Sequence, residues 1–253
     1  MKNNKSNLNE FLKIKNITDK SADLYFYGDI VSDYYDSWDD TDQYPEQIID
    51  FLNEVGDKNL NIYINSPGGN VFAGIAIYNM LKRHKGYKTV YIDGIAASIA
   101  SVISMCGDRI VCPSNAYFMI HKPLLLTCGN ANHLRESAET LDKLEEGILN
   151  IYQTKLQEGT SIDTIKQLVN EETWLTGEDA VKYFDIEVSD KVNIIAKCDS
   201  DYFNKFTKVP KELGIEEYTD VIDKVENKSK SKEIANKNNE LEKEKLLLEL
   251  DLI

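Results

Sequence analysis

The segment from Gly94 to Gly107, GIAASIASVISMCG, constrains the fold of this chain most strongly, because it contains no charged residue. From Ser98 to Cys106 every residue is apolar, small or serine, so a helix here has no polar face to turn toward water. Such a helix is stable only inside a fold, where close packing also fixes the position of its first turn. The sequence therefore predicts a layered structure built around this segment.

The segments on either side alternate between strand and helix patterns. A helix over residues 70 to about 84 carries an apolar stripe, and a helix over about 130–157 is long enough to predict a projecting element. Strands are predicted where apolar residues alternate or cluster between turn signals, in LYFYGDI, NLNIYIN, KTVYID, RIVC, YFMI and DIEVSDKVNII. This order predicts an α/β domain in which helices cover a sheet.

Length and charge set further limits on a chain of 253 residues with a formal net charge of −14. The negative charge disfavours binding to nucleic acid or to an anionic membrane. A polar start, MKNNKSNLNE, and the lack of any long apolar run predict a cytoplasmic protein without a signal peptide or a membrane span. We predict a flexible arm over residues 1–22, a core domain over 23–196, a connecting segment over 197–222 and a charged helical tail over 223–253, which either is solvated or binds a partner.

The three histidines can be separated by their surroundings. His84 lies in a charged helix end, LKRHKGYK, and is expected to face solvent, while His133 lies at the polar start of the long helix. His121 closes the apolar strand YFMI and is followed by Lys122 and Pro123, which end the strand. A histidine at a strand end can be either a packing residue or part of a site.

Ser98 follows the small residues Gly94, Ala96 and Ala97 and opens the buried helix. One interpretation is an ordinary N-cap. The other is a nucleophile that attacks a carbonyl group while helix-end amides, especially that of Ile99, stabilise the oxyanion.

A loop of sequence Asn-Ser-Pro-Gly-Gly-Asn, residues 65–70, lies between a predicted strand and helix. Gly68 and Gly69 either form a plain turn or free the backbone to point an N–H group outward. It is not a phosphate-binding loop, because no Gly-Lys-Ser/Thr follows. A glycine-rich donor loop, a helix-opening serine and a strand-end histidine together point to acyl transfer more specifically than any one of them.

Three segments, INSPGGNVFAG, DGIAASIAS and YFMIHKP, closely resemble the signatures of the ClpP family of serine peptidases, and the resemblance extends over about residues 23–195. It implies the ClpP/crotonase-like α/β fold of stacked ββα units with a long projecting helix, and an ATP-independent serine endopeptidase. Ser98 would be the nucleophile and His121 the general base, with an oxyanion hole at Gly68, Gly69 and Ile99, where the amides of Gly69 and Ile99 would be the donors. Neither a metal nor a cofactor is implied.

The acid of this triad departs from the family pattern. Bacterial ClpP has an aspartate at this point of the sequence. Matching Trp174 and Leu175 to the family's aromatic-aliphatic pair places Glu172 at the position of that aspartate, with Glu171 as the substitute. Adjacent residues on a strand point to opposite faces, so only one of the two could reach the histidine. Two solvated acids before a helix are the competing interpretation.

Within the family, GNANHLRESAETLDK, the ETWLT string and the charged tail look most like the head maturation proteases of tailed phages. That resemblance implies capsid or scaffold proteins as substrates, a homo-oligomeric ring in the form of a heptamer or double heptamer, and action in the host cytoplasm. Two other hypotheses stay open: an assembly component of ClpP fold with weak or no peptidase activity, and a crotonase-type acyl-CoA enzyme.

Overall fold

The structure is a computed structural model that describes residues 17–37, 39, 41–191, 200–210 and 213. The predicted tail and most of the predicted arm lie outside the described residues. Residues 1–209 form one compact unit and residues 210–253 another, and the site described below belongs wholly to the first. No helix among the described residues is long and apolar enough to cross a membrane.

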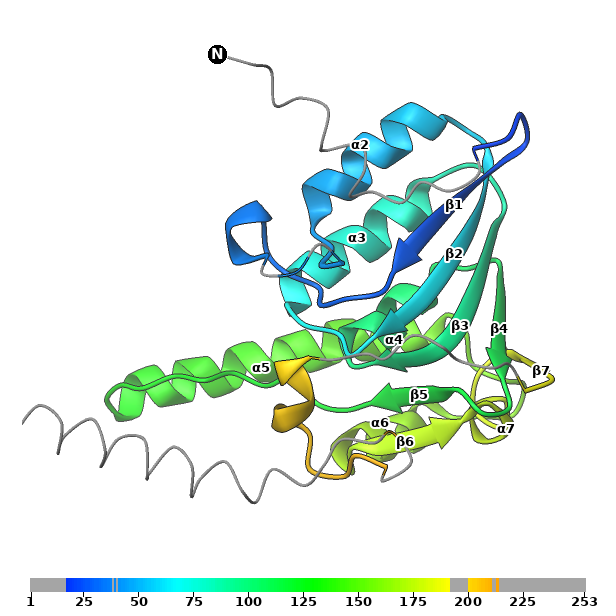
Figure 1. Ribbon diagram of the computed structural model, residues 1–253. Helices are drawn as coiled ribbons and strands as arrows, with labels where there is room; N and C mark the ends of the chain where they lie inside the picture. The colour runs from blue at the N-terminus through cyan, green and yellow to red at the C-terminus, as the bar shows by residue number, and fades with distance from the viewer. Residues whose placement is uncertain (1–16, 38, 40, 192–199, 211–212, 214–253) are drawn as a thin grey trace, which may run out of the picture. The chain divides into compact units, whose positions relative to one another are not determined.

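A seven-stranded sheet forms the centre of this unit (Figure 1). Five strands are hydrogen-bonded in the order β1-β2-β3-β4-β7, with β5 paired to β3 and β6 paired to β5. All pairs are parallel except β5–β6, which is antiparallel. The strands are β1 Ser21–Phe26, β2 Asn59–Ser66, β3 Lys88–Ala97, β4 Arg109–Pro113, β5 Tyr117–Ile120, β6 Thr173–Thr176 and β7 Glu187–Ser189.

Helices pack around this sheet, with α2 and α3 beside one another in Figure 1. The helices are α2 Pro45–Val55, α3 Val71–Arg83, α4 Ile99–Ser104, α5 Ala131–Gln153, α6 Ile162–Asn170 and α7 Gly177–Ala180, with short 3-10 turns η1 Tyr34–Asp36 and η2 Asp201–Lys205. All six residues of α4 are buried, which confirms the prediction of an internal helix.

The long strand β3 pairs with different strands along its length, and the site lies where it ends. Its first part, at Thr89–Tyr91, pairs with β4, and its last part, at Ile95–Ala97, pairs with β5. Residues 94–97, which the sequence places in the same uncharged segment as the buried helix, continue the strand, and Ile95–Ala97 pair with β5. The chain therefore passes directly from a strand into α4 at Ser98.

Two other boundaries differ from the predictions. β1 begins at Ser21, inside the predicted arm, because residues 21–26 pair in register with residues 59–64 of β2. The helix α2 was not predicted at all. It begins with Pro45 at its first turn and buries Ile48, Phe51 and Val55, so its apolar side packs into the core.

The helix α5 confirms the prediction of a long projecting element. In Figure 1 it runs well past the edge of the sheet, and almost all of residues 131–144 are exposed. Only its C-terminal half is anchored, through the buried Ile148, Leu149 and Tyr152. The Tyr152 hydroxyl lies 2.7 Å from the Ser101 hydroxyl, which ties α5 to α4.

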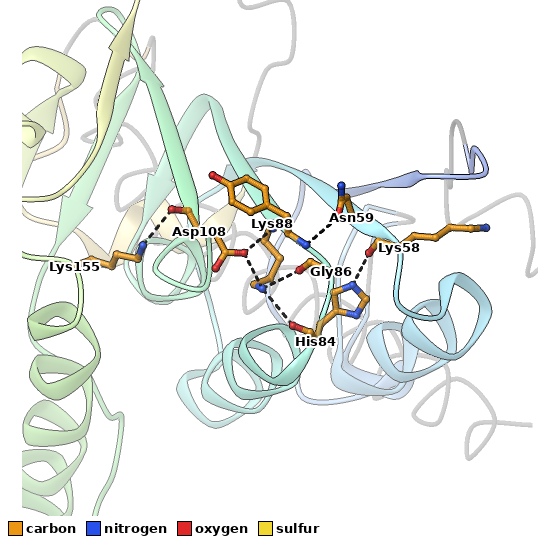
Figure 2. A network of polar contacts seen from close by, with 8 residues as sticks. Lys58, Asn59, His84, Gly86, Lys88, Asp108 and Lys155 are labelled. Carbon is orange, nitrogen blue, oxygen red and sulfur yellow. Dashed lines mark hydrogen bonds and ion pairs between the residues drawn. The ribbon is translucent and has the colours of Figure 1, made fainter.

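A polar network fixes the start of β3, at the opposite end of that strand from Ser98 (Figure 2). The buried Lys88 ammonium forms an ion pair with Asp108 at 3.0 Å and donates to the carbonyl oxygens of Gly86 and His84. The His84 Nε2 atom lies 2.7 Å from the Lys58 carbonyl oxygen. The prediction that His84 faces solvent therefore holds only in part, because its half-buried ring reaches the Lys58 carbonyl group just before β2.

Candidate active site

Ser98 lies in the bend where β3 ends and α4 begins. Its N–H group donates to the Met119 carbonyl oxygen at 3.0 Å, which fixes the bend against β5. Its φ of 56° is left-handed, an uncommon conformation for a residue with a side chain. Although it occupies the N-cap position, its side chain caps no helix N–H. Its Oγ atom instead lies 2.7 Å from the His121 Nε2 atom.

His121 reaches Ser98 because it follows the last residue of β5, the strand that pairs with the end of β3. Burial lowers the pKa of its imidazole to about 4, although the nearby Glu172 carboxylate acts in the opposite direction. At neutral pH the ring is therefore uncharged and can accept a proton. The next residue, Lys122, forms an ion pair with Glu145 of α5 at 3.2 Å, which anchors the chain as it leaves β5.

The glycine loop lies against Ser98 and needs both of its glycines. Gly68 and Gly69 have φ values of 97° and 147°. A Cβ atom on Gly68 would stand 2.8 Å from the Ser98 Cβ and 3.0 Å from the Ile99 nitrogen, so any side chain would push the loop away. The Gly68 N–H group donates to Ser66 Oγ at 3.1 Å. Of the predicted oxyanion-hole amides, those of Gly69 and Ile99 are therefore the better candidates.

The two glutamates lie in a turn between α6 and β6, not on a strand as predicted. Glu171 is the C-cap of α6, and its side chain accepts a hydrogen bond from Gln167 at 3.2 Å at the surface. Glu172 precedes β6 with a φ of 50°. Its charge acts on the His121 imidazole, but in the described part of the chain His121 makes a hydrogen bond only to Ser98. The structure thus brings Glu172 near the pair and leaves Glu171 outside.

Backbone strain marks the same place. Among the described residues, Ser98 and Glu172 are the non-glycine residues with positive φ. Such conformations are costly and persist only where the surrounding structure enforces them, which is common at functional sites. Ser98 bonds His121 directly, and the charge of Glu172 acts on the same ring.

A cavity of about 380 Å³ opens beside Ser98 and His121. Its walls are mostly apolar, and Lys205 supplies its one charged side chain. The lining residues come from the glycine loop with the start of α3, the chain after β5, the middle of α5 and the segment around η2: Gly69, Asn70, Val71, Phe72, Ser98, His121, Pro123, Leu124, Leu125, Thr140, Leu141, Leu144, Tyr202, Lys205 and Phe206.

Residues 202–208, which the sequence predicts as part of a connecting segment, also contribute to this site. The Phe206 ring packs edge-on against the His121 ring, with centroids 5.2 Å apart, and against Trp174 at 5.7 Å. The signal that could have found this segment is its aromatic density, since Tyr202, Phe203 and Phe206 stand in an otherwise polar stretch.

Within residues 17–191 and 200–210, interrupted only by the gaps given above, no three His, Cys, Asp or Glu side chains are arranged to hold a metal ion. The chemistry that the arrangement can perform is nucleophilic: a hydroxyl bonded to an uncharged imidazole, beside backbone amides at a helix start.

Comparison with known proteins gives a consistent result. The family model described as Clp protease matches residues 25–186. The chain is 33% identical over 131 residues to the ATP-dependent Clp protease proteolytic subunit 1 of Protochlamydia amoebophila. This aligned region covers 50% of this chain and 62% of that protein. The chain is also 33% identical over 129 residues to the corresponding subunit of Bacteroides fragilis, covering 50% and 61%. A match to the subunit of Mesostigma viride has 32% identity over 137 residues, covering 53% and 58%.

These matched regions span between 58% and 62% of the length of those relatives. The family match supports the predicted ClpP/crotonase-like α/β fold, with which the sheet and its helices agree. Because the family model covers residues 25–186, well over half of the sequence, this chain belongs to the Clp protease family.

Proposed function

We propose that this protein is a serine-type peptidase that cleaves polypeptides through an acyl-enzyme on Ser98. The observation that carries the proposal is the 2.7 Å separation between Ser98 Oγ and His121 Nε2, made by a serine that caps no helix. A serine that served only as a helix cap would direct its oxygen to the amides of α4 instead.

In the proposed mechanism, His121 takes the Ser98 proton as Oγ attacks the scissile carbonyl carbon, and the amides of Gly69 and Ile99 stabilise the oxyanion. His121 then gives that proton to the leaving amine, and the peptide C–N bond breaks. Water then attacks the acyl carbon and gives a proton to His121, the ester C–O bond to Ser98 breaks, the new carboxyl terminus leaves, and His121 returns the proton to Oγ. These steps need no metal, cofactor or nucleotide.

A fluorophosphonate probe tests this proposal on the full chain, because it forms a covalent bond only with an activated serine. We expect stoichiometric labelling that peptide mapping places on Ser98 and that His121→Ala removes. Labelling spread over several serines, or none at all, would contradict the proposal. It would then favour the alternative of an assembly component with the ClpP fold. The remaining alternative, an acyl-CoA enzyme, predicts coenzyme A binding, which we do not expect for a site with the Ser98–His121 pair.

The pH dependence of labelling follows from the burial of His121. Since burial lowers the pKa of the imidazole to about 4, the ring loses its proton well below pH 6.5 and the rate should already be at its plateau by neutral pH. The charged groups of the site are the Glu172 carboxylate, whose charge acts against this lowering of the His121 pKa, and Lys205, which lines the cavity. Labelling rates measured from pH 3 to 8 test this prediction. A midpoint of the labelling rate at pH 6.5 or above would contradict it and show that the His121 ring is hydrated.

We propose a closed homo-oligomeric ring as the assembly, with seven subunits or two stacked rings of seven by family resemblance. Its support is the apolar surface of the single chain, where Leu124, Leu125, Leu126 and Leu134 are exposed at and before the start of α5. Light scattering at micromolar concentration should give a mass several times 28.8 kDa. A monomer at that concentration would rule out the ring.

As substrate we propose the capsid or scaffold proteins of a tailed phage, cleaved in the host cytoplasm during head maturation. The support is the likeness of GNANHLRESAETLDK, ETWLT and the charged tail to such proteases. Co-expression with the neighbouring capsid gene, followed by mass spectrometry of new N-termini, should reveal cleavage sites that vanish with Ser98→Ala. Intact capsid protein in the presence of a labelled, active enzyme would exclude this substrate while leaving the peptidase.

A further inference from the structure

We infer that Thr207 is a positioning residue of the active site: together with the Lys208 amide, it holds the Glu172 carboxylate beside His121. The inference rests on the proposed peptidase function and deepens it. It makes the segment Tyr202–Lys208, which lies beyond the region matched by the family model, a working part of the site.

Three hydrogen bonds hold the Glu172 carboxylate, and all come from this segment. The Thr207 N–H group donates to Oε1 at 2.7 Å and its hydroxyl donates to Oε2 at 2.9 Å. The Lys208 N–H group also donates to Oε1 at 2.7 Å, and its ammonium group binds the Glu171 carbonyl oxygen. Both oxygens are thus fixed, so the carboxylate cannot rotate freely about its last bond.

Glu172 requires such anchoring for two structural reasons. It sits in a strained turn with a φ of 50°, a conformation that persists only where surrounding contacts enforce it. Its side chain is one methylene longer than an aspartate, so a freely rotating carboxylate would spread its charge over a larger volume. A charge that stabilises the imidazolium must be held in place before the proton moves.

The rest of the segment is built against the same histidine. Phe206, the residue before Thr207, packs on both His121 and Trp174, and Trp174 lies in β6 two residues after Glu172. Phe203 packs in turn on Phe206, with ring centroids 6.1 Å apart. This aromatic cluster fixes where Thr207 and Lys208 present their donors.

A segment that lies over an active site could instead act as a brake that withholds Glu172 from His121. Two observations favour positioning. The Ser98–His121 bond is formed with the segment in place, and a cavity of about 380 Å³ remains open beside both residues. Tyr202, Lys205 and Phe206 form one wall of that cavity rather than filling it.

The test compares Thr207→Val, which removes the hydroxyl donor, with Thr207→Ser, which keeps it. With a fluorophosphonate probe and a peptide substrate, we expect Thr207→Val to lower the labelling rate and kcat by on the order of 10-fold, with KM little changed. Thr207→Ser should restore most of the rate. Thr164→Val, at an exposed threonine in α6 with its own side-chain contact, is the matched control and should label like wild type.

A double-mutant cycle shows whether Thr207 acts through the glutamate. In a Glu172→Gln background, Thr207→Val should cost much less than it does alone. An equal loss in both backgrounds, or no loss in either, would overturn the inference. Faster labelling by Thr207→Val would also overturn it and identify the segment as a brake. Wild-type protein that is not labelled at Ser98 would instead contradict the proposed function itself.

Discussion

Replacing Ser98 with alanine should lower peptide cleavage by at least about 10⁴-fold while leaving the fold and the assembly unchanged. The change deletes one oxygen atom. Because that oxygen caps no helix amide, its removal costs α4 no capping hydrogen bond. Alanine also keeps a Cβ atom at the same left-handed φ, so the strain at this bend is the same in both proteins. The loss of activity therefore reports on chemistry rather than on folding.

The measurement compares wild type, Ser98→Ala, His121→Ala and the double variant on one peptide substrate, with thermal unfolding as the control for fold. Serine and histidine act as one unit, since the free hydroxyl is a weak nucleophile without its base and the base has no covalent role without the hydroxyl. The double variant should therefore be no worse than either single variant. Residual Ser98→Ala activity within 10-fold of wild type would remove this serine from the mechanism.

The parts of the site that the sequence could predict are those whose signals are local. Ser98 and His121 stand at ends of strands, and Gly68 and Gly69 mark a sharp turn, so a few neighbouring residues reveal each of them. The pairing of β3 with β5 then brings the serine and the histidine together. These four residues could therefore be proposed as one site from the sequence, and the structure shows how they lie relative to one another.

Boundaries were less predictable, because distant partners decide them. The apolar residues 95–97 would suit a buried helix as well as a strand, yet pairing with β5 keeps them in the strand. Glu172 and Glu171 could not be separated by spacing, because the turn that contains them depends on how α6 ends against β6.

The segment around Thr207 was the least predictable part of the site. Its contacts with Glu172 join residues 35 and 36 positions apart, and two of its three hydrogen bonds come from backbone N–H groups, which any sequence carries. Only the aromatic residues Tyr202, Phe203 and Phe206 distinguish it from an ordinary connection. Contacts made by backbone N–H groups do not depend on residue type, so the sequence cannot predict them and only the structure shows them.

Glu172→Gln should give the second large effect, a fall in kcat of up to about 10⁴-fold, the size the corresponding Asp→Asn change has in another serine protease. The amide keeps the shape of the side chain but carries no charge to stabilise the imidazolium of His121. Its single oxygen could still accept from the N–H groups of Thr207 and Lys208, which share Oε1, but the amide nitrogen that replaces Oε2 cannot accept from the Thr207 hydroxyl.

Glu171→Gln is the control for this prediction, because the Glu171 side chain bonds Gln167 at the surface, whereas it is the Glu172 charge that raises the pKa of His121. Its kcat should stay close to wild type. The kcat of both variants is measured on the same substrate over a range of pH. Their unfolding temperatures are measured at the same pH values, because a loss caused by misfolding would appear as a lower unfolding temperature at every pH. Small and equal losses would leave a Ser98–His121 dyad without an acid, and a larger loss for Glu171→Gln would transfer the role to that residue. A large loss confined to Glu172→Gln would mean that the charge held by Thr207 and Lys208 is the one that drives proton transfer at Ser98.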